Sequence, residues 1–150
     1  MDFSELTKMK EDYQRAVREE GEGILKKFVS EFFTSHPEIK RLGWTQYTPY
    51  FNDGEPCIFR VGEVCFDIPA LNQYADYPAE DDEDDYINVH NWVDSWSIGY
   101  HAPKEGLTED TKFFSEAIDS MGDILEIIFG DHTQVVVYPD HFEVTEYEHD

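Results

Sequence analysis

The chain has 150 residues, of which 34 are acidic and 11 basic, so its formal net charge at pH 7 is −23. A field of this sign repels nucleic acid and anionic membranes, and attracts basic surfaces over about 8–10 Å at physiological salt. The charge therefore argues against a protein that binds nucleic acid directly, and it predicts a basic protein surface as partner.

The charge is unevenly distributed along the chain. Eight of the eleven basic residues lie in the first 41 positions, where nine acids nearly balance them. Residues 42–150 carry 25 acids against Arg60, Lys104 and Lys112, and so hold almost all of the net charge. The near-neutral N-terminal end could lie against the acidic body of the same chain or of a second copy. A homodimer is therefore one hypothesis for the quaternary structure.

The composition is that of a folded protein. The chain is 40% hydrophobic and contains eleven Phe, nine Tyr and three Trp, whereas disordered chains are poor in aromatic residues. One domain over residues 1–150 is expected at this length. The first residues lack the basic and apolar regions of a secretory signal, and no run approaches the roughly 18 apolar residues of a membrane span. We therefore expect a cytoplasmic protein that does not enter the membrane.

Residues 3–35 are predicted to form a long amphipathic helix. Apolar residues recur there at steps of three, four or seven, which is the helical period. The stripe consists of Phe3, Leu6, Met9, Tyr13, Val17, Ile24, Phe28 and Phe32, widened by Leu25, Val29 and Phe33. Gly21 and Gly23 each cost about 1 kcal/mol relative to alanine, so a kink or a break into two helices is expected there. Pro37 ends the segment.

The pattern changes to strands over residues 39–68. Residues 44–50 are dense in β-branched and aromatic side chains. Residues 57–61 and 64–68 are predicted to form a hairpin around Gly62-Glu63. The alternation in residues 64–68 is typical of a sheet that is covered on one side.

Residues 69–106 are predicted to be irregular. They contain six consecutive acids, which must be solvated, paired or bound. Within residues 87–100 the apolar spacing favours a helical turn or two, and a strand through Trp92, Asp94 and Trp96 is the alternative.

A second helix is predicted from an N-cap at Thr108 to Phe129, with Gly130 as its C-terminal cap. Residues 133–138 and 142–147 then form a second hairpin. The order α-β-β-β-irregular-α-β-β predicts an α+β fold, in which two main helices pack on one face of an antiparallel sheet.

Two segments resemble a group of small acidic proteins of bacteria and their phages. The first is Trp44-Thr45-Gln46-Tyr47-Thr48-Pro49-Tyr50-Phe51-Asn52-Asp53-Gly54-Glu55-Pro56-Cys57, and the second is Phe129-Gly130-Asp131-His132 with the acidic hairpin that follows. Together they cover about a quarter of the chain. The resemblance implies an intracellular bacterial or phage setting and carries over no catalytic residue.

Aromatic residues in the first of these segments are candidates for binding a partner. Trp44, Tyr47 and Tyr50 could form an exposed patch, because Trp and Tyr dominate the hot spots of protein interfaces. The structural alternative is an aromatic strand that leads into a turn, where Gly54 permits positive φ.

Acidic residues form the second candidate set for partner binding. The set consists of Glu80, Asp81, Asp82, Glu83, Asp84, Asp85 and Asp94. These carboxylates could imitate backbone phosphates and occupy a groove that binds nucleic acid. They could instead hold a divalent cation, or form a solvated loop that only serves solubility.

No pattern of catalytic or metal-binding residues is found. The six histidines show no metal-ligand spacing, and neither a nucleophile elbow nor a phosphate-binding loop occurs. Asp131-His132 and His141 could face each other across the C-terminal hairpin, although a structural or surface role fits them better. Cys57 and Cys65 are predicted on opposite faces of the sheet and therefore unpaired. We expect a protein that is not an enzyme and has no cofactor and no metal.

These observations lead to two hypotheses for function. The first is a non-enzymatic acidic binding protein of bacterial or phage origin, which docks on a basic surface of a partner such as a nucleic-acid-binding protein. In its strong form, the protein is a nucleic-acid mimic that inhibits a host defence effector. The alternative is a structural or adaptor protein that binds through the aromatic patch, while the charge serves solubility.

Overall fold

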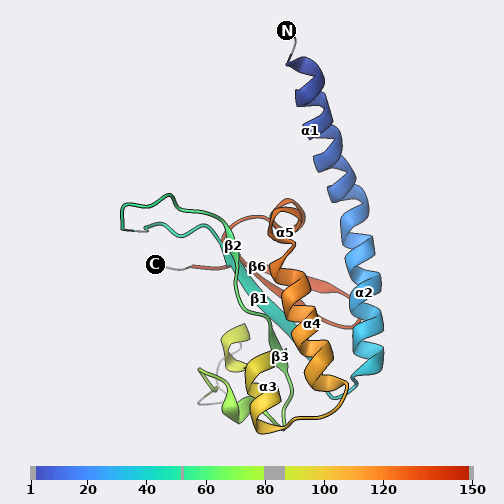
Figure 1. The fold of residues 1–150 in the computed structure, drawn as a ribbon, viewed down its shortest axis with the longest axis vertical. Coiled ribbons are helices and arrows are strands. Elements are labelled where there is room, and N and C mark those ends of the chain that lie inside the picture. The colour runs from blue at the N-terminus through green and yellow to red at the C-terminus, as the bar shows by residue number, and fades with distance from the viewer. Residues whose placement is uncertain (1–2, 52, 80–86, 149–150) are drawn as a thin grey trace.

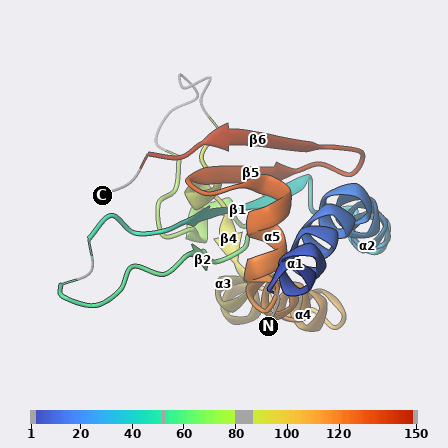
Figure 2. The same ribbon diagram turned by 90° about the horizontal axis from the view of Figure 1, so that it is seen from above.

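The computed structural model describes residues 3–51, 53–79 and 87–148. Within these ranges, one six-stranded antiparallel sheet packs against helices, which confirms the predicted α+β class (Figures 1 and 2). The strands are β1 (Arg41–Tyr47), β2 (Arg60–Val61), β3 (Cys65–Asp67), β4 (Val93–Asp94), β5 (Thr133–Val137) and β6 (Phe142–Glu146). Their order is β4-β3-β1-β5-β6, and β2 also pairs with β1. The α-helices are α1 (Ser4–Ala16), α2 (Glu22–Ser35), α3 (Ser95–His101), α4 (Leu107–Asp119) and α5 (Gly122–Phe129).

The N-terminal helix is continuous through both glycines. A π-helical segment, η1 (Val17–Gly21), joins α1 to α2, and the flanking residues keep helical backbone angles. A Cβ atom on Gly21 would lie 3.0 Å from Cδ1 of Ile128, so glycine lets α5 approach the helix closely here. The expected interruption is therefore a π-helical segment and not a break between two helices.

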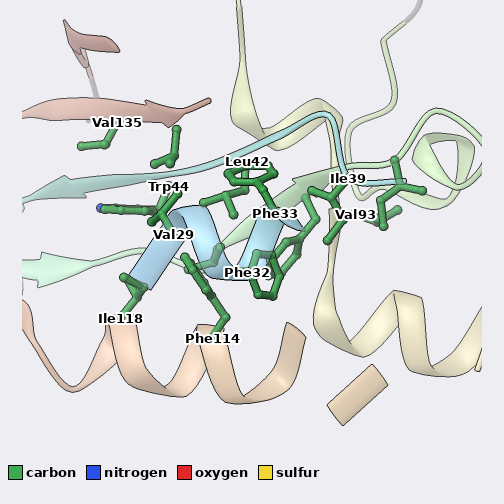
Figure 3. Packing of buried hydrophobic residues seen from close by; sticks show 14 of the residues in the cluster. Val29, Phe32, Phe33, Ile39, Leu42, Trp44, Val93, Phe114, Ile118 and Val135 are labelled. Atoms are coloured by element: carbon green, nitrogen blue, oxygen red, sulfur yellow. The ribbon is translucent and has the colours of Figure 1, made fainter. Parts of the chain in front are cut away.

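The main core lies between the sheet and the helices (Figure 3). Leu42 and Trp44 of β1 point into it and are fully buried. On the helical side, the ring of Phe32 lies 4.7 Å from that of Phe114, measured between centroids, and 5.9 Å from that of Phe66 in β3. These contacts join α2, α4 and the sheet, so burial of the aromatic stripe holds the layers together.

The other face of the sheet is also covered at its centre. Residues of a short 3-10 helix (Val89–Asn91) and Trp92 pack there against Cys65 and Val136. A Cβ atom on Gly43 would lie 2.6 Å from a methyl group of Val89, so only glycine allows this approach. The prediction of a sheet covered on one side is therefore wrong at this position. Cys65 is buried on this second face, whereas Cys57 is exposed, and both are free.

The predicted hairpin at Gly62-Glu63 does not form. Both β2 and β3 pair with β1, and they run along it as one interrupted strand. The register changes by one residue between the pair Gln46↔Val61 and the pair Gly43↔Cys65, which is the signature of a β-bulge. The amide of Gly62 donates to the carbonyl of Thr45 at 2.7 Å, where a side chain would have little room.

The C-terminal half differs from the prediction in its helices and agrees in its hairpin. The expected second helix is interrupted between α4 and α5. Its N-cap is Gly106, whose amide donates to Glu109 Oε2 at 2.7 Å, and not Thr108. Gly130, with φ of 91°, follows α5 as expected, and β5 and β6 form the predicted hairpin.

Residues 87–101 combine the two alternatives from the sequence. The strand hypothesis applies to β4, which is only two residues long, and the helix hypothesis applies to α3. Asp94 lies at the junction and caps α3, because its Oδ1 accepts from the amide of Ser97 at 2.7 Å.

Candidate interaction surfaces

The three aromatic residues predicted to form a patch do not lie together on the surface. Trp44 is fully buried, and its indole N–H donates to Gln46 Oε1 at 2.9 Å. Tyr47 is half-buried, whereas Tyr50 is 65% exposed and stacks on His132 with centroids 4.9 Å apart. The prediction of Trp44 as a surface residue is therefore wrong, because β1 turns the Trp44 side towards the helices.

A different pair of aromatic residues is exposed on α3. Trp96 and Tyr100 are 68% and 70% exposed, and their rings stack at 5.3 Å with an interplanar angle of 7°. Next to Tyr100, the ring of His101 stacks on that of Tyr74 at 3.9 Å. The signal in the sequence was the spacing of four residues between Trp96 and Tyr100, which places two side chains on one face of a helix.

Of the acidic residues predicted to bind a partner, only Asp94 can be placed. It is half-buried and serves as the cap of α3. The run Glu80–Asp85 lies outside the described residues.

Exposed carboxylates lie on several elements of the described structure. They occur on the helices α4 and α5, on the edge strand β6 and in the loops. The described ones beyond residue 41 are Asp53, Glu55, Glu63, Asp76, Glu105, Glu109, Asp110, Glu116, Asp119, Asp123, Asp140, Glu143, Glu146 and Glu148. The negative charge is therefore not confined to one face.

Some of the few cations are already used within the chain. Arg41 donates to Asp67 Oδ2 at 2.7 Å and lies over the ring of Trp92, and Lys104 lies 3.7 Å from Glu38. His36 is buried at the end of α2, and its Nε2 lies 2.7 Å from Asp110 Oδ2 at the start of α4. The salt bridges of Arg41 and Lys104 neutralise one carboxylate each, so most of the negative charge remains available to a partner.

Three carboxylates meet near the start of α3. The pKa of Glu63 is raised, first by loss of hydration and then by the neighbouring charges of Asp94 and Asp76. A carboxyl with a raised pKa binds its proton more tightly in the folded state than in the unfolded chain. Its stabilising contribution is therefore present below its ordinary pKa of 4.5 and is lost as the pH rises through the raised value.

We therefore expect Glu63→Gln to raise the melting temperature at pH 7 and to have little effect at about pH 4, where the carboxyl is protonated. Thermal unfolding followed by circular dichroism at both pH values measures this. The control is Glu55→Gln, which makes the same change of net charge in an exposed loop. Equal stabilisation by both variants would mean that only the total charge matters.

Asp131 and His141, which could have faced each other across the C-terminal hairpin, each form hydrogen bonds with other residues. Burial raises the pKa of Asp131, but hydrogen bonds from the amide and hydroxyl of Thr48, at 2.7 and 2.6 Å, outweigh it and lower the pKa. His141 Nδ1 lies 2.7 Å from Asp140. Asp131 therefore ties the end of β1 to the C-terminal hairpin, and the geometry gives it a structural role.

An apolar groove lies between the N-terminal helix and the helices α4 and α5. It has a volume of about 510 Å³. The side chains that line it include Tyr13, Val17, Ile24, Phe113, Met121 and Ile128. Ile24 and Phe113 are 69% and 63% exposed. The apolar stripe of the N-terminal helix was predicted from the sequence, but its spacing does not show which part of the stripe stays exposed, so this surface was not predicted.

Within residues 3–51, 53–79 and 87–148, no group of three or more His, Cys, Asp or Glu side chains is arranged to hold a metal ion. None of the helices in these ranges combines the length and the apolar composition that a bilayer span requires.

The comparisons with known proteins give no match: no family model, no curated protein and no solved structure is significantly similar to this chain. The function must therefore be argued from the surfaces themselves.

Proposed function

We propose that this protein is a non-catalytic binding protein that docks its acidic surface on a basic surface of a partner protein in the cytoplasm. The observation that carries the proposal is the excess of carboxylates beyond residue 41, where the chain contains 25 acidic and only three basic residues. Such a surface attracts cationic patches and accelerates association with them.

The strong form of the proposal is imitation of nucleic acid. A partner that normally binds phosphates offers many Lys and Arg side chains, which form the same charge-assisted hydrogen bonds with carboxylates. A bacterial or phage setting would make a nuclease of host defence a suitable target. The spread of carboxylates over α4, β6 and the loops supports docking on a basic surface in general more than a single phosphate-like row.

A second candidate function rests on the exposed rings of α3. Stacked Trp96 and Tyr100 form an apolar platform of the kind that anchors protein interfaces, so an adaptor that binds through them is the alternative. In that case the charge would serve solubility, and alanine at both positions would abolish binding at any salt concentration.

The test is capture of partners from a bacterial lysate on the immobilised full chain, followed by elution with duplex DNA. We expect DNA to displace the captured protein if both occupy the same basic site. A partner that resists DNA but elutes with salt would retain charge-driven docking and refute mimicry. A partner that resists both would refute the proposal and favour the adaptor.

Two matched variants locate the docking surface. One neutralises Asp81, Asp82, Asp84 and Asp85 to Asn, and the other makes the same change of net charge by amide substitutions at Glu105, Glu116, Asp119 and Asp123. If only the first variant loses the partner, the acidic run is the binding segment. Equal losses would mean that the whole field attracts the partner.

A further inference from the structure

The helix α1 projects beyond the body of the protein (Figure 1). Its apolar stripe is exposed to solvent. None of the residues of α1 is buried, and Phe3, Leu6, Met9 and Tyr13 are 65%, 60%, 67% and 52% exposed. Most helical stability in proteins comes from packing of an apolar face, and the 13 residues of α1 have no buried side chain that would supply it. Burial of this stripe against another surface would therefore stabilise α1.

The stripe on α1 and the apolar groove form one continuous surface. Tyr13 belongs to both, and Val17 and Ile24 continue the stripe along the same helix into the groove. Phe113 of α4 forms part of the opposite wall and is 63% exposed. A helix with an apolar face is the shape that fits such a groove.

We propose that α1 of one copy lies in the groove of a second copy, in a reciprocal dimer. The chain carries both the exposed apolar helix and an apolar groove, and most of its own α1 extends beyond the body of the protein, with only the C-terminal end of α1 lining the groove (Figure 1). Because the helix is continuous from Ser4 to Ser35, α1 cannot fold back. With a two-fold axis, α1 of each copy would enter the groove of the other copy, so both apolar surfaces would be covered in both copies.

The local charges favour this occupant. Residues 4–18 carry four cations and three acids, so α1 with the start of η1 is a basic segment in a very acidic protein. The helices α4 and α5 on the far side of the groove carry six acids and only Lys112. The basic segment of one copy would therefore meet the acidic helices of the other, and this sets the orientation.

The dimer and the docking on a basic partner respond differently to salt. Two copies of net charge −23 repel each other at long range, and this repulsion exceeds the attraction between a segment of net charge +1 and helices of net charge −5. Added NaCl screens the repulsion, so we expect the dimer to become tighter as salt rises. Docking on a basic partner should weaken under the same change, so failure of one proposal can be told from failure of the other.

Sedimentation of the full chain over about 1 to 100 μM, the range in which moderate protein affinities lie, tests the proposal. We expect a species of twice the 17.6 kDa chain mass. Leu6→Glu on the stripe and Phe113→Lys in the groove should each weaken dimerisation roughly tenfold or more, as loss of an interface anchor does. Both side chains are exposed, so the melting temperature of the monomer should be retained.

The control is Thr7→Glu, which makes the same change of charge on α1 beside the stripe and should weaken the dimer far less than Leu6→Glu. An equimolar mixture of Leu6→Glu and Phe113→Lys should form a heterodimer, because one unaltered α1 can still enter one unaltered groove. A monomeric wild-type chain would overturn the proposal and leave the groove to a different ligand. The proposal would also be overturned if Leu6→Glu or Phe113→Lys dimerised as tightly as the wild type, or if their mixture stayed monomeric.

Discussion

Replacing Trp44 with alanine is expected to lower the free energy of unfolding by about 3–5 kcal/mol. The indole is fully buried between the sheet and the helices, and its ring lies 6.2 Å from that of Phe129 at the end of α5. Alanine would leave a cavity there, because the surrounding layers relax only partly. Since natural domains are stable by about 5–15 kcal/mol, the variant should be marginal.

Urea unfolding at low temperature, followed by tryptophan fluorescence and circular dichroism, measures this loss. The matched control is Trp96→Ala, which removes an exposed indole from α3 and should change stability by less than about 0.5 kcal/mol. A Trp44→Ala variant of normal stability that has lost its partner would show that Trp44 is a surface contact after all.

Gln46→Leu is the second large effect that we expect, with a loss of about 2–4 kcal/mol. Gln46 is fully buried, yet its amide is satisfied on every side. Its Nε2 donates to the carbonyls of Leu125 and Gly130 at 2.9 and 2.7 Å, and its Oε1 accepts from the indole of Trp44. Leucine has nearly the same volume but would leave the buried indole N–H without an acceptor and release the end of α5 from β1.

Chemical denaturation gives the size of this effect, and Gln73→Leu at an exposed position is the control. Hydrogen exchange adds a specific readout, because the amides of α5 should exchange faster in Gln46→Leu. If the variant were as stable as the wild type, the hydrogen bonds of Gln46 would contribute nothing net and α5 would be held by apolar packing alone.

Local patterns in the sequence predicted the elements whose partners are near in the chain. The helical stripe over residues 3–35 and the hairpin of β5 and β6 were predicted because period and turn residues are local signals. The N-cap at Gly106 was missed because Glu109, and not a side chain at the cap, satisfies the first amide.

The strand pairing and the burial of individual side chains depend on long-range contacts, which the local sequence does not show. Nothing local shows that residues 60–67 pair with β1 instead of with each other, or that Gly43 admits Val89 to the second face. The sequence likewise could not tell which of the aromatic residues near Trp44 point inwards. The apolar groove was not predicted for a related reason. The apolar stripe runs along the whole N-terminal helix, but only residues of α2, in its second half, are buried.

The measurement that tests the central claim most directly is the affinity for the captured partner as a function of NaCl. Docking through carboxylates predicts that the dissociation constant rises steeply between about 50 and 200 mM salt, as it does when many phosphate contacts are screened. An affinity that stays constant or improves with salt would contradict the account, because apolar contacts are not weakened by screening.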